Sequence, residues 1–533
     1  MLFDADRKLI VYEGEDVERV ADLAKLVKGG YAVLDATYRN LLELARREIE
    51  APDPMEKYDW PRAPGEEPFP TQKIVSSFMV VNPRSFVLSD MRTGKTRAAL
   101  WAADWLMSRS KVPLKCLVVS DITALSKSWG AEIAKQFFGR RTHEMVYGSA
   151  AQRVSALARP ADFYLINHDG LRIGAPKREV REGDDGRPAV THVPSRSVFK
   201  AMAEKKFDIV IFDEAATYRS HTTGVFKAAR AVSRESPYVW LLTGTPDPNG
   251  PEDAYGLKML CHPTTQLSFK KWRDSVVTSY GQFDKPVVKD DAAEKVDELL
   301  KPAIRINQSQ CFDQPPAIFH DVSADMTEEQ KSFMRKLKQE FMVQTACGGT
   351  ISAVNAAALR TKLIQIGCGV VYDVDHQERF IDASPRLDTL CKLVGGISGK
   401  VIIFSPLTSV TNMIARRLGD IAVSTSGISS RNKKLELLHY WQSAPDKKAL
   451  VSHPGPIARG VDLTSANVII WYSPTDRVEY YLQANQRING IKQKKRQHII
   501  KMSCNPIEKD IYSRLEDKAD LQSAILKLKE FEL

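Results

Sequence analysis

Short apolar runs alternate with helical patterns over a long stretch of the chain, from Phe69 to about Leu260. The runs lie at residues 86–88, 116–119, 163–166, 209–212 and 239–242. Both faces of each run are apolar, which is typical of parallel strands that are buried on both sides. This strand–helix alternation predicts a doubly wound α/β lobe with right-handed crossovers.

The same strand–helix alternation returns near the C-terminus, with apolar runs at 401–404, 421–423, 449–451, 468–471 and 498–500. Between the two α/β stretches the pattern is mostly helical. Here Thr327-Glu-Glu-Gln330 has the spacing of a capping box, and we expect it to open a helix through Phe341. The sequence therefore predicts an α/β fold with two parallel-sheet lobes and helical insertions.

The remaining residues complete a plan of five segments. A small N-terminal module has helical spacing at 17–27 and 38–49, and its proline-bearing end is interpreted as a linker. Residues 174–198, rich in Gly, Pro and charge, are predicted to form an exposed insertion. The predicted segments are the module and linker (1–66), the first lobe (67–262), a helical segment (263–385), the second lobe (386–505) and a helical tail (506–533).

Composition narrows the class of protein. The 533 residues are 43% hydrophobic and 27% charged, which is typical of a globular chain and excludes fibrous and low-complexity classes. No apolar run approaches the roughly 18 residues of a membrane span, and the acidic N-terminus is not a signal peptide. Seven scattered cysteines, none in a C-x-x-C pair, predict a reducing, cytoplasmic location without disulfides or a zinc ribbon. The net charge of +10 allows an anionic partner without requiring one.

The first candidate for chemistry is the stretch S-D-M-R-T-G-K-T at residues 89–96, which follows a predicted strand and precedes a helical pattern. It is a P-loop with Ser89 in place of the first glycine. Backbone N–H groups at a helix N-terminus bind phosphates, Lys95 would reach the β- and γ-phosphates, and the Thr96 hydroxyl would bind Mg²⁺. The alternative is an ordinary helix N-cap. The predicted ATP-binding residues of this loop are Met91, Arg92, Thr93, Gly94, Lys95 and Thr96.

A pair of carboxylates supplies the second half of this site. The apolar run at 209–212 ends in Asp213 and Glu214. Asp213 is predicted to hold Mg²⁺, and Glu214 is predicted to orient and deprotonate the attacking water. An acidic loop that merely caps a strand is the alternative. Together the two motifs predict ATP and Mg²⁺ as cofactors.

The order of the motifs along the chain resembles superfamily-two helicases, and within them the Swi/Snf-type double-stranded DNA translocases. The motifs are 89–96, Asp-Glu-Ala-Ala at 213–216, Thr-Gly-Thr-Pro at 243–246, the fifth motif at 458–464 and the sixth at 483–493. Leu117-Val-Val-Ser120 with Trp129 and Glu132 is similar to motif Ia and its following helix. Phe69-Pro-Thr-Gln72 resembles the adenine-contacting Q segment. The resemblance covers roughly residues 66 to 505, and Tyr58-Asp-Trp-Pro61 is similar to phage-encoded members.

The resemblance implies two RecA-like lobes with ATP in the cleft between them. Gln72, Gly460 and Asp462 would contact the nucleotide, while Gln483 and Arg487 would act on it from the second lobe. DNA would lie across both lobes, and closing on ATP and opening after hydrolysis would move them along one strand. The implied function is a DNA-dependent ATPase that translocates on duplex DNA and remodels it, by branch migration or by displacement of bound protein.

Three positions depart from the family pattern. Arg92 stands where the family usually has glycine and places an extra cation near the phosphates. Ala215-Ala216 follows the Asp-Glu pair, so the subfamily cannot be read there. Gly490 stands where the second arginine of the sixth motif, usually an arginine finger, is expected. Arg487 is therefore predicted to be the one arginine of this motif that serves the γ-phosphate.

Candidate DNA contacts are of two kinds. A basic run with Lys492, Lys494, Lys495, Arg496 and Lys501 follows the sixth motif and is interpreted either as a phosphate-binding surface or as a solvated loop. Asn167 and His168 resemble motif Ib, which touches the DNA backbone; a structural histidine is the alternative. We expect a monomer that contacts double-stranded or branched DNA through its phosphates with little sequence preference. An RNA helicase of the same superfamily and an ATP-gated DNA clamp with little turnover are the competing functions.

Overall fold

The computed structural model describes three short strands, β1 (Leu2–Asp4), β2 (Leu9–Val11) and β3 (Ala32–Val33), and most of residues 54–527. Within the latter range it leaves out residues 91, 174–177, 183–187, 193–197, 245, 247–249, 279–286, 312–315, 347–352, 373–376, 429, 458–461 and 491–492. The helices predicted at 17–27 and 38–49 lie outside the described residues. The chain divides into two compact units, Met1–Phe312 with Leu521–Leu533, and Asp313–Asp520.

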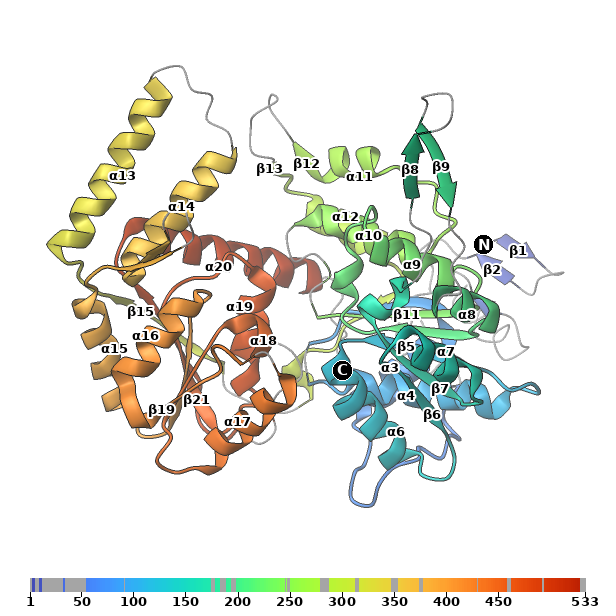
Figure 1. Cartoon of the computed structure of the whole chain (residues 1–533). Helices are drawn as coiled ribbons and strands as arrows, with labels where there is room; N and C mark the ends of the chain where they lie inside the picture. The colour runs from blue at the N-terminus through green and yellow to red at the C-terminus, as the bar shows by residue number, and fades with distance from the viewer. Residues whose placement is uncertain are drawn as a thin grey trace. The chain divides into compact units, whose positions relative to one another are not determined.

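The first unit is built on a seven-stranded sheet with the order β14-β4-β11-β10-β5-β7-β6. Four of these strands, β5, β6, β7 and β11, are labelled in Figure 1. Every pairing in this sheet is parallel. Its strands are β4 (Arg84–Val87), β5 (Cys116–Ser120), β6 (His143–Val146), β7 (Phe163–Asn167), β10 (Ile209–Phe212), β11 (Tyr238–Leu242) and β14 (Ala303–Ile304). The five predicted strands of this lobe are confirmed, and the outer strands β6 and β14 are additional.

Helices cover both faces of this sheet, because successive strand residues alternate between two apolar cores. Leu117 and Val119 belong to one core, and Cys116 and Val118 belong to the other. The first core is closed by α7 (Ala150–Ala158), α8 (Val198–Lys205), α9 (Gly224–Ser233), α10 (Ala254–Cys261) and α12 (Ala292–Leu299). The second is closed by α3 (Pro70–Val81), α4 (Lys95–Arg109) and α6 (Ala131–Gln136).

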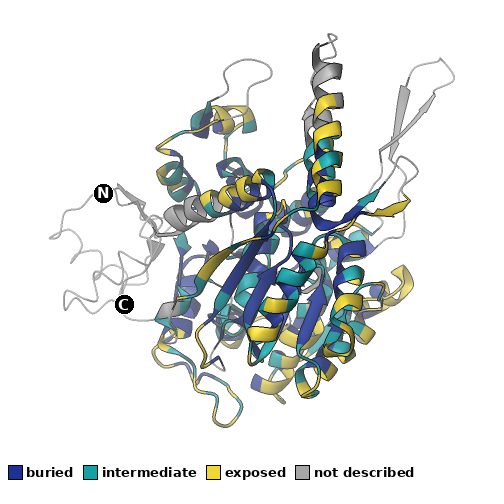
Figure 2. Ribbon diagram, turned by 90° about the vertical axis from the view of Figure 1, so that its left-hand side faces the viewer, coloured by how far each residue is buried: buried dark blue, intermediate teal, exposed yellow. Residues whose placement is uncertain are grey.

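The second unit holds a six-stranded sheet with the order β15-β22-β21-β18-β20-β19, again parallel throughout. Its strands are β15 (Ile318–Ser323), β18 (Lys400–Phe404), β19 (Ala422–Ser424), β20 (Ala449–Ser452), β21 (Ala466–Trp471) and β22 (His498–Ser503). Figure 2 shows buried strands in dark blue between helices whose outer faces are exposed. The predicted α/β fold with two parallel-sheet lobes is confirmed.

The second sheet is flanked by α15 (Ser384–Gly396), α16 (Thr408–Leu418), α17 (Arg431–Ser443), α19 (Val478–Asn485) and α20 (Pro506–Lys527). Two further helices, α13 (Glu328–Ala346) and α14 (Ala353–Cys368), precede them. The capping box before α13 is present, since Gln330 N–H donates to Thr327 Oγ1 at 3.3 Å and Thr327 N–H donates to Gln330 Oε1 at 3.0 Å. No helix in the described part of the chain is long and apolar enough to cross a membrane.

The stretch 263–385 does not form a unit of its own. Its first part, with α11 (Phe269–Val276), α12 and β14, belongs to the first unit, and its second part, with α13 and α14, belongs to the second. The division falls there because β14 pairs with β4 in the first sheet, whereas β15 pairs with β22 in the second. Within the predicted insertion at 174–198, β8 (Arg178–Glu182) and β9 (Pro188–His192) form an antiparallel pair.

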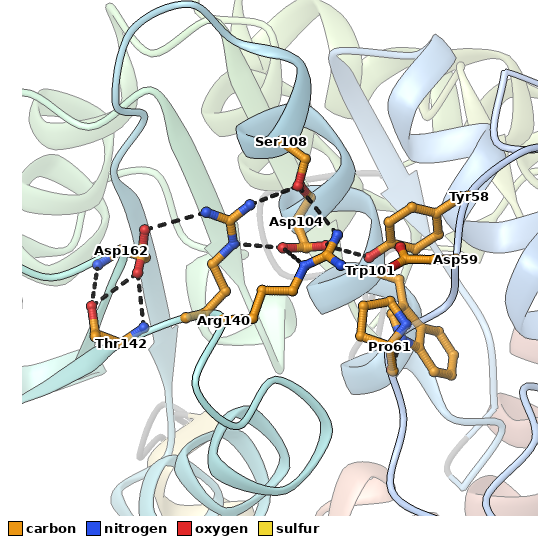
Figure 3. Close-up of polar contacts among 10 residues, drawn as sticks. Tyr58, Asp59, Pro61, Trp101, Asp104, Ser108, Arg140, Thr142 and Asp162 are labelled. Atoms are coloured by element: carbon orange, nitrogen blue, oxygen red, sulfur yellow. Dashed lines mark hydrogen bonds and ion pairs between the residues drawn. The ribbon is translucent and has the colours of Figure 1, made fainter.

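The proline-bearing stretch before the first lobe is not a linker, and that part of the sequence interpretation is wrong. Residues 54–66, which we call the leader strap, lie against the core of the first unit, with Met55, Tyr58 and Trp60 buried. The indole of Trp101 on α4 donates to the Pro61 carbonyl at 2.8 Å (Figure 3). Apolar side chains spaced between the prolines bind the strap to the helix that follows the P-loop.

A buried carboxylate anchors the strap and a following loop to α4 (Figure 3). Asp104 is fully buried and accepts a hydrogen bond from the Tyr58 hydroxyl at 2.6 Å. Arg140 donates to both of its oxygens, at 2.6 and 3.1 Å, and Arg141 donates to Oδ1. Burial, with the charge of Asp104 next to the phenol, raises the pKa of Tyr58, so the hydroxyl stays a donor.

Candidate functional site: a nucleotide and metal site with a nucleic-acid surface

The P-loop joins β4 to the N-terminus of α4. Lys95, the first residue of α4, donates from Nζ to the carbonyl of Ser89 at 2.6 Å and to that of Asp90 at 2.8 Å. Burial lowers the pKa of Lys95. The carboxylates of Glu214, Asp213 and Asp90 oppose this shift, so they lie close enough to act on the charge of the ammonium. The lysine of the P-loop and the acidic pair therefore share one site.

Gly94 and Gln72 meet at the start of α4. Gly94 has φ +83°, a left-handed conformation that favours glycine. A Cβ at this position would come within 1.9 Å of Gln72 Nε2. The Gln72 side chain, whose Oε1 accepts from Phe69 N–H at 2.9 Å, is thus held against the P-loop backbone. The structure brings the predicted Q-segment residue to the predicted phosphate loop.

Two residues without glycine's freedom adopt left-handed backbone in this site. Arg92 has φ +65° and Glu214 has φ +48°. The left-handed conformation costs an L-residue about 1 to 2 kcal/mol, and such outliers cluster at functional sites. The value at Arg92 gives the physical reason why glycine suits this position of the loop. Met91 lies outside the described residues.

The acidic pair lies at the carboxyl end of β10. Asp213 Oδ2 accepts from the Ser120 hydroxyl at 2.9 Å and from the Trp129 indole N–H at 2.9 Å. Its Oδ1 accepts from Glu214 N–H at 3.1 Å. Ser120 ends the neighbouring parallel strand β5. Because β4, β5 and β10 run parallel, the P-loop and these side chains gather at the carboxyl edge of one sheet, where α/β folds bind ligands.

The residues present fit Mg²⁺, which shares its ligands with phosphate and water, better than a metal ion whose ligands are all protein side chains. Thr96 offers a hydroxyl and Asp213 a carboxylate, and both are the hard oxygen ligands that Mg²⁺ prefers. Among the described residues, no group of three His, Cys, Asp or Glu side chains is placed to hold a metal ion. This chemistry suits an ion that takes its other ligands from phosphate and water.

The candidate residues of the second unit lie on α19 and the following turn, η7 (Gln486–Ile488). Gln483 and Arg487 are both buried, at 3% and 7% exposure. Gln483 Nε2 donates to Glu479 at 3.3 Å, and the Arg487 carbonyl accepts from Leu463 N–H at 3.2 Å. The sixth motif is thereby tied to the end of the fifth. The catalytic role of Gln483 and Arg487 stays a prediction.

The fifth motif is described only in part. Gly460 lies outside the described residues. Asp462 is exposed, its carboxylate accepts from Thr464 N–H at 3.0 Å, and its carbonyl accepts from Gln442. These bonds make the end of the motif a local turn, and the nucleotide contact of Asp462 stays a prediction.

The two candidate residues after β7 differ in environment. Asn167 is half-buried, and its Oδ1 accepts from Arg153 at 3.1 Å. His168 is 7% exposed, and its Nδ1 lies 2.9 Å from the hydroxyl of the fully buried Tyr218. Tyr218 ends η3 (Ala215–Tyr218), the turn that follows Glu214. The geometry therefore favours the structural alternative for His168, as a connection between this segment and the acidic pair.

The basic run after the sixth motif is also divided. Lys494, Lys495 and Arg496 are exposed, as a phosphate-binding surface requires. Lys501 is not part of that surface, because its buried ammonium is paired with Asp321 at 3.1 Å and with Glu516. The inclusion of Lys501 in a run that either binds phosphate or forms a solvated loop is therefore wrong. Lys492 lies outside the described residues.

Comparison with known families finds a match over more than half of the chain. The profile of the SNF2-related domain matches residues 81–365, which include the P-loop, the acidic pair and the Ser120–Trp129 segment. The chain belongs to the SNF2-related family.

Several proteins are similar to this SNF2-related chain. A putative protein of Acyrthosiphon pisum secondary endosymbiont phage 1 is 22% identical over 461 residues, 81% of this chain and 90% of the phage protein. An uncharacterized ATP-dependent helicase of Mycoplasma genitalium is 24% identical over 334 residues, 61% of this chain. An ISWI chromatin-remodeling complex ATPase of Arabidopsis thaliana is 22% identical over 344 residues, 60% of this chain. The alignments to the last two span 31% of each relative's length.

Solved structures of the Sulfolobus solfataricus SWI2/SNF2 ATPase core are also similar. One, in complex with double-stranded DNA, is 18% identical, covers 87% of this chain and 94% of its own, and has a TM-score of 0.40. Another, of the core domain, is 18% identical, covers 86% of this chain and 91% of its own, and has a TM-score of 0.37.

Two features of this SNF2-related chain escaped sequence reasoning. The P-loop is buttressed by the segment after β14, where Arg305 pairs with Asp90 at 3.3 Å and Ile306 N–H donates to Ser89 Oγ at 3.0 Å. Sequence carries little signal for it, since β14 has only two residues. The second feature is a cavity of about 660 Å³ in the second unit, at the carboxyl ends of β18, β19 and β20. It is lined by Thr408, Thr411, Thr425, Ser426, Gly427, Ile428, Lys434, His453, Gly455 and Tyr480.

The cavity has the chemistry of an anion site. Hydroxyls follow the ends of β18 and β19, His453 follows β20, and Lys434 adds a positive charge. Burial lowers the pKa of His453, and the charges of Arg477 and Lys434 act in the same direction. The available signal in the sequence was the presence of hydroxyl residues a few positions after the apolar runs at 401–404 and 421–423.

Proposed function

We propose that this SNF2-related protein is a DNA-dependent ATPase that translocates along duplex DNA and remodels it. The observation that carries the proposal is the convergence of Lys95, Asp213 and Glu214 at one edge of the first parallel sheet, with Asp213 oriented by three donors. A lysine that can pair with phosphates, next to two carboxylates that can hold a metal ion and a water, is the combination that ATP and Mg²⁺ require.

Each residue of the site has a distinct role in this proposal. Lys95 neutralises charge on the β- and γ-phosphates, and Thr96 and Asp213 hold the metal ion. When bound, Mg²⁺ neutralises charge developing on the phosphates. Glu214, directly after the metal carboxylate, orients the attacking water and accepts its proton. Gln72 contacts the adenine from the start of α3.

The second unit completes the reaction in our proposal. Gln483 and Arg487 act on the same nucleotide, and Arg487 alone stabilises the charge on the γ-phosphoryl group. Gly490 has φ +149°, a backbone conformation that a side chain rarely adopts. An arginine finger at this position would be strained, which supports assigning the charge to Arg487.

DNA is bound through its phosphates in this proposal. The exposed run 494–496, Asn167 and the hydroxyl-lined cavity with Lys434 offer cations and neutral donors, which position a nucleic-acid backbone without reading sequence. The free thiols among the described cysteines support the proposal of a reducing compartment. We propose that the protein works as a monomer in the cytoplasm of the host cell of a phage.

ATP hydrolysis by the full chain tests the proposal. Rates are measured without nucleic acid and with duplex DNA, single-stranded DNA or RNA, and Lys95→Ala serves as the inactive control. Stimulation by duplex DNA is expected, together with release of a third strand from a DNA triplex as the protein moves along. Preferential stimulation by RNA would favour the RNA helicase alternative. If the protein retains DNA only when ATP is bound but hydrolyses little ATP, the clamp would be favoured. That alternative remains because Gly490 stands where an arginine finger is expected.

A further inference from the structure

The carboxylate of Asp213 is held from a segment far away in sequence. Trp129 belongs to a π-helical turn, η1 (Leu125–Gly130), which leads directly into α6. Its ring is fully buried, and its indole N–H lies 2.9 Å from Asp213 Oδ2. Single π-helical turns are uncommon and occur frequently at functional sites. The turn thus places the indole, a rigid hydrogen-bond donor, against Oδ2 of Asp213.

The same segment also contacts the residue that follows Thr96, the second candidate metal ligand. Glu132 on α6 accepts from Arg97 Nε at 2.8 Å and from Arg97 Nη2 at 3.3 Å. Arg97 directly follows Thr96 in α4. We call residues 125–136 the metal-site bracket, because they bind Asp213 on one side and the residue next to Thr96 on the other.

The leader strap is attached to this bracket as well. Glu66 accepts from Arg97 at 2.6 Å and from Gln136 Nε2 at 2.8 Å, and it is paired with Lys135. Ala63 N–H donates to Gln136 Oε1 at 2.9 Å. The arginine, three side chains of α6 and the strap form one connected polar network.

We propose that Trp129 is a positioning residue for the metal ion: its indole N–H fixes the Asp213 carboxylate so that Oδ1 faces the metal and its waters. Oδ2 accepts hydrogen bonds from both Ser120 and Trp129, whereas Oδ1 accepts one, from Glu214 N–H at 3.1 Å, and so keeps a lone pair for the metal. Groups that orient a metal-binding carboxylate typically change metal affinity 10- to 100-fold when removed. This inference rests on the proposed function, because it presumes a nucleotide-bound metal ion at Asp213.

The test separates metal-dependent from metal-independent nucleotide binding. The affinity of the full chain for a slowly hydrolysed fluorescent ATP analogue is measured with excess Mg²⁺ and again with EDTA. Trp129→Phe keeps an aromatic side chain, smaller than indole, and removes the N–H. We expect this variant to lose about tenfold or more of the affinity gained from Mg²⁺, with affinity in EDTA within about twofold of the parent.

A matched control is available in the same unit. Trp101 is also fully buried and donates its indole N–H to the Pro61 carbonyl at 2.8 Å, away from Asp213. Trp101→Phe should leave the Mg²⁺-dependent gain at the parent value. An equal loss in both variants would show a general effect of a missing buried indole bond and overturn the inference.

The remaining outcomes are also decisive. A parent-like gain in Trp129→Phe overturns the positioning role while leaving the proposed ATPase intact. A parent that gains no affinity from Mg²⁺ overturns the proposed metal site itself. If circular dichroism shows that Trp129→Phe does not fold, Ser120→Ala, which removes the other donor to Oδ2, decides the question by the same measurement.

Discussion

The buried carboxylate of Asp104 offers the sharpest test of the packing of the first unit. Asp104→Asn keeps the size of the side chain and removes its charge. It leaves Arg140 and Arg141 without their shared buried partner and weakens the 2.6 Å bond from Tyr58. Removing one partner of a buried ion pair typically costs about 3 to 5 kcal/mol.

The exposure of the two arginines places the expected cost at the lower end of that range. Their side chains are 31% and 15% exposed, and each keeps a second acid, Asp59 for Arg140 and Asp162 for Arg141. We therefore expect the free energy of unfolding of the first unit to fall by about 3 kcal/mol. That is roughly a 10²-fold rise in the population of its open state.

Pulsed thiol labelling, read peptide by peptide, measures this population for each unit. Cys116 on β5 is fully buried and Cys368 of the second unit is also fully buried, so each reacts only when its unit opens. Burial raises the pKa of both thiols, which makes reaction in the closed state slower still. Asp104→Asn should speed labelling of Cys116 about 10²-fold and leave Cys368 unchanged.

Tyr58→Phe is the graded control for the same cluster. It removes one donor to Asp104 and leaves both arginines in place, so a loss of about 1.5 kcal/mol and roughly tenfold faster labelling of Cys116 are expected. If Asp104→Asn labels Cys116 at the parent rate, the buried ion pair does not stabilise the unit and this reasoning is refuted.

Four further outcomes follow from the geometry. Arg92→Gly should raise the free energy of unfolding by about 1 kcal/mol, because glycine adopts the left-handed backbone without strain. The same variant should bind ATP more weakly in a titration. A lower free energy of unfolding would contradict the inference that Arg92 is strained. Burial lowers the pKa of His262 to about 3. The free energy of unfolding should therefore be highest above pH 6.5 and fall as the pH is lowered toward 3, by up to about 2 kcal/mol at pH 5. The urea midpoint measured against pH should show this fall, and His262→Asn should flatten it. Neutralising residues 494–496 together should reduce the salt slope of DNA binding by up to about 2.7, and an unchanged slope would mark a solvated loop. Arg487→Ala should lower kcat with saturating duplex DNA at least about 10³-fold while ATP binding is kept, and a loss of only a few-fold would show that another group serves the γ-phosphate.

The central strands and the phosphate loop could be predicted from the sequence because their signals are local. A strand buried on both faces, such as β10, must be an unbroken apolar run whatever surrounds it. The strand–loop–helix order around Lys95 likewise brings backbone N–H groups to a helix N-terminus without help from distant residues. The capping box at Thr327 is local in the same sense.

Edge strands and long-range polar contacts were decided only by the tertiary structure. The outer strand β15 is largely exposed, so it lacks the apolar run that marks a central strand. The leader strap looked like a linker because its prolines dominate locally, and its burial depends on α4 lying beneath it. The bond from Trp129 to Asp213 joins residues 84 positions apart. Such a pairing depends on which segments meet when helices pack on the sheet, and no local pattern encodes that meeting.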